Sequence, residues 1–219
     1  MPASAKITAL RQLLSEKGFS SGIPTPESAF TTGLSAVDEH EVPQRGITEI
    51  VGSPTEGTGG TLLLYGLVHA MRDERVAIVD ATDSFDPSSV SAADLPHLLW
   101  VRCSDSLQAS KAADMVLRDG NVSLAILLLS LASPSELRRI HANVWHRLQV
   151  LSEQSAVPLL AFTPTPIVGN AKLRLNVHGQ FPLRSVTRSR SALLPSMRLT
   201  VQKRRLNLGG GDVRRAASA

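Results

Sequence analysis

One segment constrains the fold more than any other: an apolar run at 47–51 is followed at once by a glycine-rich stretch at 52–60. The run ITEIV is typical of a buried strand, and the residues from 61 onward are typical of a helix. A strand, a glycine-rich turn and a helix in this order form the layout of a phosphate-binding P-loop, whose pattern is G-x-x-x-x-G-K-[ST]. The segment therefore predicts an α/β fold with the backbone architecture of a nucleotide-binding protein.

The side-chain chemistry of that pattern is missing. Gly52 and Gly57 keep the glycine spacing, but Thr58 stands at the lysine position and Gly59 at the hydroxyl position. The lysine would neutralise the β- and γ-phosphates, and the hydroxyl would hold Mg²⁺. We interpret the glycines as an ancestral tight turn; weak nucleotide binding through backbone N–H groups at the helix start is the alternative. This vestigial P-loop comprises Gly52, Gly57, Thr58, Gly59, Gly60 and Thr61.

Composition indicates one domain with a full core, because 42% of the 219 residues are hydrophobic. Aromatic residues make up only 4%, so aliphatic side chains must build that core, with Trp145 and Trp100 expected inside it. The single cysteine, Cys103, excludes an internal disulfide and fits a reducing compartment. The longest apolar run, Leu124–Leu129, is too short to cross a bilayer, and no signal peptide is evident. We expect a soluble cytoplasmic protein.

Apolar runs alternate with helical patterns through the body of the chain. Strands are expected at 48–51, 75–80, 98–102, 124–129 and 158–162, and helices at 61–71, 106–118 and 134–154. This alternation predicts a mostly parallel, twisted sheet with helices on both faces. Residues 172–178 and 197–203 instead alternate polar and apolar side chains, as edge or antiparallel strands do.

Three regions are expected along the chain. Residues 1–27 form an amphipathic helix and a linker, residues 28–183 form the core domain, and residues 184–219 form a basic extension with a final strand and a flexible tail. Leu10, Leu13 and Leu14 share one face of the N-terminal helix. That face either packs on the body or docks on another chain.

The charge is distributed unevenly between these regions. Residues 1–183 carry a net charge of about −4, and residues 184–219 carry about +8. An acidic body with a basic end predicts that the end contacts an anionic partner, and a solvated tail is the alternative. The basic residues are Arg184, Arg188, Arg190, Arg198, Lys203, Arg204, Arg205, Arg214 and Arg215.

Several segments in order resemble the RecA superfamily over about residues 28–178. FTTGLSAVD at 30–38 is similar to the entry that precedes the P-loop in those proteins, and GITEIVG at 46–52 is similar to the strand that leads into it. VDATDSFDP at 79–87 follows the "DAE…DP" segment after the second strand. The resemblance implies a RecA-like P-loop fold.

More particular segments resemble the ImuA branch of this superfamily. They are LLWVRC at 98–103, SLQA at 106–109 and ADMVLRDG at 113–120. ImuA-like proteins are RecA-like accessory proteins encoded with an inactive Y-family polymerase homologue. The resemblance implies a role in translesion synthesis during the DNA damage (SOS) response. Its implied partners are that ImuB-like homologue, RecA and the error-prone DnaE-type polymerase, reached through the N-terminal leucines and the basic C-terminal residues.

Residue-by-residue comparison with the superfamily predicts a pseudo-ATPase without cofactor or metal. The glutamate that polarises the attacking water falls on Thr82. The acid that holds Mg²⁺ falls within 128–130, and the glutamine that senses the γ-phosphate falls near Thr163 and Pro164. Each lost group would act through charge or hydrogen bonding, so their joint absence predicts no ATP hydrolysis.

Two other functions stay open. The first is a weak ATP-binding RecA paralogue in which Lys172 reaches a phosphate in place of the missing lysine. The second is a cell-division inhibitor of the SulA type that acts on FtsZ. Direct recombinase-like DNA binding is poorly supported, because the loops at 133–139 and 164–172 are short and mostly neutral. The basic end is a candidate for nonspecific contact with DNA phosphates.

The remaining polar clusters have simple structural interpretations. Asp80, Asp83 and Asp86 follow a strand and are a possible metal set, but Asp86 before a proline also fits a helix N-cap, which we favour. His141 and His146 are five residues apart, which is not the spacing of a helical metal pair. The sequence therefore predicts no metal site.

Overall fold

The computed structural model describes residues 28–52, 59–179, 181, 185 and 187–205. Residues 28–205 form one compact unit, which includes the basic residues from Arg188 to Arg205. Some residues of the predicted partner-binding set and of the vestigial P-loop lie outside the described residues. They are Leu10, Leu13, Leu14, Gly57, Thr58, Arg184, Arg214 and Arg215. Among the described residues, no helix combines the length and the apolar character needed to span a membrane.

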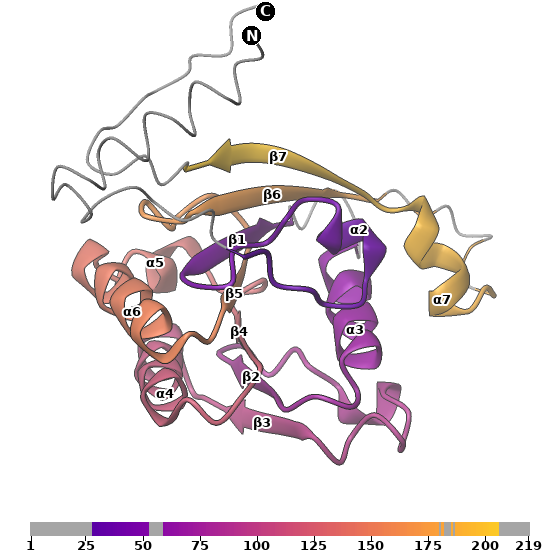
Figure 1. Ribbon diagram of the computed structural model, residues 1–219, viewed down its shortest axis with the longest axis horizontal. Helices are drawn as coiled ribbons and strands as arrows, with labels where there is room; N and C mark the ends of the chain where they lie inside the picture. Colours follow the sequence, from indigo (N-terminus) through magenta and orange to yellow (C-terminus); the bar gives the residue numbers. More distant parts are fainter. Residues whose placement is uncertain (1–27, 53–58, 180, 182–184, 186, 206–219) are drawn as a thin grey trace, which may run out of the picture. The chain divides into compact units, whose positions relative to one another are not determined.

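The centre of this unit is a seven-stranded sheet (Figure 1). Its strands are β1 (Ile47–Val51), β2 (Val76–Asp80), β3 (Leu98–Arg102), β4 (Leu124–Leu128), β5 (Leu159–Thr163), β6 (Leu173–His178) and β7 (Arg198–Arg204). The strand order is β3-β2-β4-β5-β1-β6-β7. All neighbours pair in parallel except β6 and β7. The predicted α/β class and the mostly parallel sheet are confirmed.

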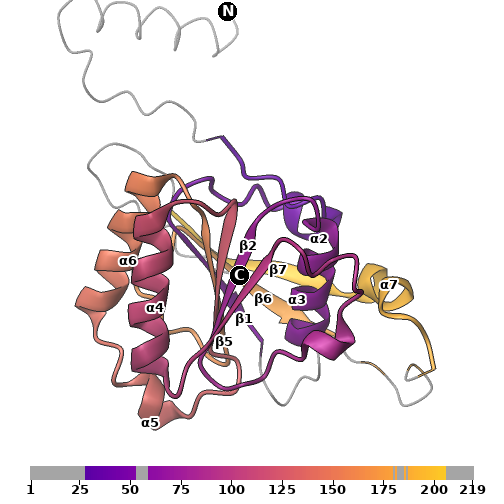
Figure 2. The same ribbon diagram turned by 90° about the horizontal axis from the view of Figure 1, so that it is seen from below.

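Helices cover both faces of the sheet, as Figure 2 shows. They are α2 (Ser35–Asp38), α3 (Gly59–Ala70), α4 (Ser106–Asp119), α5 (Pro134–Leu137), α6 (Ala142–Ser155) and α7 (Arg190–Leu193), with 3-10 turns η2 (Pro87–Ser89) and η4 (Leu194–Ser196). One apolar core lies under α3, and a second lies under α4 and α6. The predicted end of α4 is confirmed, because Gly120 caps it in the left-handed conformation at φ 69°.

Burial separates the inner strands from the edge strand β3. Every residue of β1, β2, β4 and β5 is buried, which explains their continuous apolar sequences. On β3, by contrast, Leu99 is 50% exposed. Trp100 is only partly buried, so its predicted place inside the core is half right, whereas Trp145 is buried as predicted.

The predicted single helix at 134–154 is wrong, because the chain forms two helices there. Ser133 and Glu136 make a complete capping box that starts α5, which ends after one turn. The backbone is extended again at His141, which precedes α6. Leu137 and Ile140 both reach the core across the break, so the apolar spacing continues while the helix does not.

The alternating pattern at 172–178 predicted an edge or antiparallel strand. β6 pairs antiparallel with β7, as predicted, but it is not an edge strand, because its other side pairs in parallel with β1. The alternation arises because one side of β6 contributes Leu173 and Leu175 to the core, while the other side carries the half-buried Arg174. The antiparallel edge strand is β7, as its own pattern predicted.

Candidate functional site at the carboxyl edge of the sheet

The candidate site lies where the carboxyl ends of the parallel strands meet, which is the usual ligand-binding edge of such sheets. Gly52 follows β1 here, and its N–H donates to the Thr163 carbonyl at 3.0 Å. α3 begins at Gly59, on the other side of the glycine-rich segment. The strand and the helix predicted on the two sides of this segment are therefore confirmed.

The start of α3 packs closely on the sheet. A Cβ added to Gly59 would lie 2.9 Å from Val177 Cγ1, which is closer than side chains tolerate. A Cβ on Gly60 would meet nothing within 4 Å. At the position where the P-loop pattern has its Mg²⁺-binding hydroxyl, a side chain would thus require Val177 to shift.

Strands β4 and β5 end in residues that offer no free polar group to a ligand. Leu128 and Leu129, at the position that the RecA resemblance gives to a Mg²⁺-binding acid, are 3% and 0% exposed. Thr163 is fully buried, and its hydroxyl donates to Glu49 Oε1 at 3.1 Å. The end of β4 is therefore apolar, and the hydroxyl at the end of β5 is already engaged.

The loop after β2 is organised around the buried carboxylate of Asp80. Its oxygens accept from the N–H of Thr82 at 3.1 Å, from the N–H of Phe85 at 2.8 Å and from the Ser84 hydroxyl at 3.4 Å. Thr82, at the position that the RecA resemblance gives to the catalytic glutamate, donates its own hydroxyl to Ser84 at 3.0 Å. These bonds hold the loop in shape, which gives Asp80 a structural role.

The two other aspartates of this loop also have partners. Asp83 receives two bonds from the Arg102 guanidinium, at 2.8 and 2.7 Å. Asp86 caps η2, as predicted, and the hydrogen bonds from the Ser89 and Ser88 side chains hold its pKa below the ordinary value. Within the described ranges, no group of three His, Cys, Asp or Glu side chains is placed to hold a metal ion.

Sequence reasoning missed a buried ion pair beside this edge. Glu49 is fully buried in the middle of β1, and Arg174 lies opposite it on β6 in the parallel register. The Arg174 Nε donates to Glu49 Oε2 at 2.5 Å. An acid inside the otherwise apolar run ITEIV was the available signal, because a buried charge needs a partner.

The same pair holds the loop that follows β5. Glu49 Oε1 accepts from the N–H groups of Ile167 at 2.7 Å and Val168 at 3.0 Å, and Arg174 Nη2 donates to the Val168 carbonyl at 2.9 Å. Both charged side chains are therefore bonded to groups of the protein itself. This loop, the counterpart of a DNA-binding loop in the resemblance, is bonded to the sheet.

Lys172 does not reach this edge. Its N–H donates to the carbonyl of Ile47, the first residue of β1, at 2.9 Å. Its ammonium is 3.2 Å from Glu153 Oε1. Gly52 follows the far end of β1, which is roughly 17 Å away at about 3.3 Å per residue. The hypothesis that Lys172 replaces the P-loop lysine is therefore wrong.

His141, His146 and Cys103 do not contribute reactive groups to this site. His141 and His146 are both exposed on or before α6. Cys103 is partly buried, and burial, together with the negative charges of Asp80 and Asp105, raises the pKa of its thiol. A raised pKa keeps the thiol protonated and unreactive at neutral pH.

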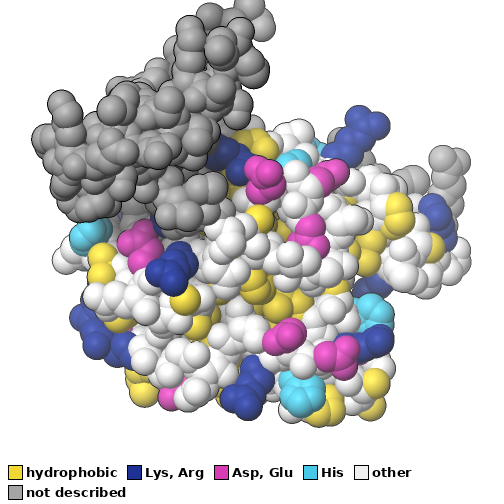
Figure 3. All heavy atoms as spheres, in the orientation of Figure 1, with side chains coloured by type: hydrophobic (Ala, Val, Ile, Leu, Met, Phe, Trp, Pro, Cys, Tyr) yellow, Lys and Arg dark blue, Asp and Glu magenta, His cyan; other side chains and the backbone are white. Residues whose placement is uncertain are grey.

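The described basic residues of the C-terminal segment differ in what they contact. Arg190 stacks on the Tyr65 ring at 4.3 Å, while the Lys203 ammonium and the Arg205 guanidinium both donate to the Gly169 carbonyl, at 2.7 and 3.1 Å. Arg204 bonds to the His40 carbonyl and to Glu41. The face in Figure 3 shows Lys and Arg side chains scattered among other types, not gathered in one patch.

Among the described basic residues of this segment, the side chains of Arg188 and Arg198 make no hydrogen bond or ion pair with the rest of the unit. Arg198 is exposed on β7, and Arg188 is exposed and donates only to the carbonyl of Ala192, four residues away. They are the described members of the predicted partner-binding set that are open to another molecule.

No protein-family model matches the sequence, and no curated protein matches it.

Proposed function

We propose that this chain is a non-catalytic RecA-like adaptor that supports translesion synthesis in the DNA damage (SOS) response. It would bind an inactive Y-family polymerase homologue, RecA, or both. The observation that carries the non-catalytic part is the close packing of Gly59 on Val177, because a side chain at the Mg²⁺ position of the P-loop pattern would force Val177 to shift.

The rest of the carboxyl edge supports the same proposal. Phosphoryl transfer needs positioned cations, a metal and a group that orients the attacking water. Here Leu128 is apolar, Thr163 donates to Glu49, and Asp80 is saturated by its own loop. Each factor of ten in rate corresponds to about 1.4 kcal/mol of transition-state stabilisation, so several missing charged groups together remove catalysis.

A titration of the full chain with a fluorescent ATP analogue and Mg²⁺, followed by an assay for phosphate release, tests this part. We expect no saturable binding at millimolar nucleotide and no turnover above the protein-free rate. Saturation at micromolar nucleotide with phosphate release would overturn the proposal.

The partner-binding part is supported by the exposed cations Arg188 and Arg198, which meet the charge expected for an acidic partner. Deleting residues 184–219 would also remove β7, so point variants are the better test. We expect Arg188→Glu/Arg198→Glu to weaken binding to the purified polymerase homologue or to RecA by tenfold or more, with reduced salt dependence. Arg72→Glu, which reverses an exposed charge at the end of α3, is the matched control and should bind normally. Unchanged affinity for both partners would overturn this part.

A further inference from the structure

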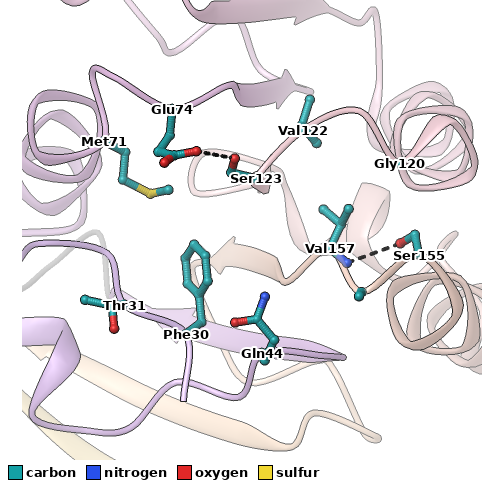
Figure 4. Close-up of a pocket in the computed structure, with 11 residues that line it drawn as sticks. Phe30, Thr31, Gln44, Met71, Glu74, Gly120, Val122, Ser123, Ser155 and Val157 are labelled. Atoms are coloured by element: carbon teal, nitrogen blue, oxygen red, sulfur yellow. Dashed lines mark hydrogen bonds between the residues drawn. The ribbon is translucent and has the colours of Figure 1, made fainter. Parts of the chain in front are cut away.

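A hollow lies at the amino edge of the sheet, at the ends of the strands opposite to the candidate site. It has a volume of about 410 Å³ and opens between the starts of β2 and β4 and the ends of α3, α4 and α6 (Figure 4). The lining is mostly polar, and Phe30, Met71, Val122 and Val157 add a smaller apolar part. This volume lies within the range of about 300–1,000 Å³ that is typical of small-molecule sites.

The electrostatic character of this hollow is set by helix ends. α3 ends one residue before Met71, α4 is capped by Gly120, and α6 is capped by Ala156, and all three of these residues line the hollow. The C-terminus of a helix presents carbonyl oxygens without intrahelical partners and carries about half a negative charge. Three such ends therefore direct negative potential into one space.

Glu74 adds a full negative charge to the same wall. Its carboxylate accepts a hydrogen bond from the neighbouring Ser123 hydroxyl at 2.5 Å, which fixes its position (Figure 4). The next residue, Arg75, directs its guanidinium to the carbonyl of Asn121 at 3.5 Å and does not line the hollow. A carboxylate with one neutral partner, next to three helix C-termini, has unused capacity for a cation.

We propose that this hollow binds a guanidinium or ammonium group carried on an aliphatic stem. The charged group would lie against Glu74 and the helix ends, while the stem packs on the apolar part of the lining, as Lys and Arg side chains do elsewhere. The ligand is either a free alkyl amine or an Arg or Lys side chain of another protein. This inference uses none of the residues on which the adaptor proposal rests.

The test is a titration of the full ¹⁵N-labelled chain followed by NMR. n-Butylguanidinium and n-butylammonium are the probes, and n-butanol and butyrate are the neutral and anionic controls. We expect saturable shifts of the Gly120, Ser123 and Val157 amides with the two cations, weaker shifts with butanol and none with butyrate. A flexible peptide with one central arginine distinguishes the sources: tighter binding than n-butylguanidinium indicates a protein partner, and weaker binding indicates a free amine.

Variants connect the binding to Glu74. Glu74→Gln should weaken n-butylguanidinium binding at least fivefold, and Ser123→Ala, which releases the carboxylate, should weaken it less. Asp73→Asn removes the neighbouring exposed acid, which does not line the hollow, and should leave binding unchanged. Glu74 is exposed, so its variant is expected to keep the fold and the amide spectrum. Equal shifts with butanol and n-butylguanidinium, or unchanged affinity in Glu74→Gln, would overturn the proposal.

Discussion

Acidic side chains at the two edges of the sheet differ in their burial and in the number of hydrogen bonds that they accept from the protein. Beside the carboxyl edge, Glu49 and Asp80 are fully buried, and each accepts several hydrogen bonds from the protein itself. At the amino edge, Glu74 is exposed and accepts one bond from a neutral hydroxyl. The comparison teaches that an acid near a strand end indicates a ligand site only when its hydrogen-bonding capacity is not already used by its own fold.

The difference has a consequence for energy as well as for binding. A buried acid with internal donors contributes to folding because removing its partners leaves a desolvated charge. An exposed acid gains little from its neighbours in water. Substitutions of buried acids at the carboxyl edge should therefore lower the free energy of unfolding. Substitutions of Glu74 at the amino edge should instead lower the affinity for the ligand.

The largest effect is expected for Arg174→Leu. This variant leaves the buried Glu49 carboxylate without its charged partner, and such a loss typically costs 3–5 kcal/mol of the free energy of unfolding. Urea denaturation at pH 7 followed by circular dichroism measures it.

The double variant Glu49→Leu/Arg174→Leu is the control. It removes both charges, so it should recover a large part of the lost stability. If the single variant loses less than about 1 kcal/mol, the pair is not the anchor that its geometry indicates.

The second-largest effect is expected when an acid at each edge is replaced by alanine and the losses of stability are compared. Asp80→Ala removes the acceptor for two backbone N–H groups and one hydroxyl, so we expect a loss of about 2–3 kcal/mol in the free energy of unfolding. Glu74→Ala, at the amino edge, should change it by less than about 0.5 kcal/mol. Urea titrations of both variants test this. Equal losses would break the comparison between the edges.

A smaller effect is expected at the start of α3. Gly59→Ser restores the hydroxyl position of the P-loop pattern but places a Cβ 2.9 Å from Val177 Cγ1, so it should cost about 1–2 kcal/mol. Val177→Ala removes the contact and should reduce the cost of the serine when the two are combined. A double-mutant cycle of urea midpoints measures this coupling. Additive losses would show that the close approach does not limit position 59.

Much of the fold could be predicted from the sequence, because the inner strands are buried on both faces and are therefore continuously apolar. The strand 98–102 was predicted with the observed bounds, and Gly120 marked the end of α4. The break between α5 and α6 could not be found from periodicity, since Leu137 and Ile140 keep the apolar spacing across it. The capping box of Ser133 and Glu136 starts the short helix α5 and so determines where the helical segment is divided.

The candidate sites were less predictable, because they depend on which distant residues meet. The missing P-loop side chains could be read directly, but the contact of Gly59 with Val177 joins residues far apart in the sequence. The pairing of Glu49 with Arg174 likewise depends on β1 and β6 lying side by side. Glu74 and Ser123 meet only because β2 and β4 are neighbours, so nothing in either local sequence indicated the hollow.

The smallest effect concerns Glu136, a partly exposed acid near the carboxyl edge that has internal donors. The N–H of Ser133 and then its hydroxyl, both at 2.8 Å, hold the pKa of Glu136 below its ordinary value. A lowered pKa means that this acid stabilises the fold above its unfolded-state pKa, and the contribution is lost as the pH falls through the folded-state pKa. Ser133→Ala removes the hydroxyl but keeps the N–H, so the pKa should rise only part of the way and stability should fall less steeply in acid. A carbon-detected NMR titration of the Glu136 carboxyl measures this. An unchanged pKa in Ser133→Ala would show that the backbone N–H alone sets it, and that internal side-chain donors matter less at this edge than the comparison requires.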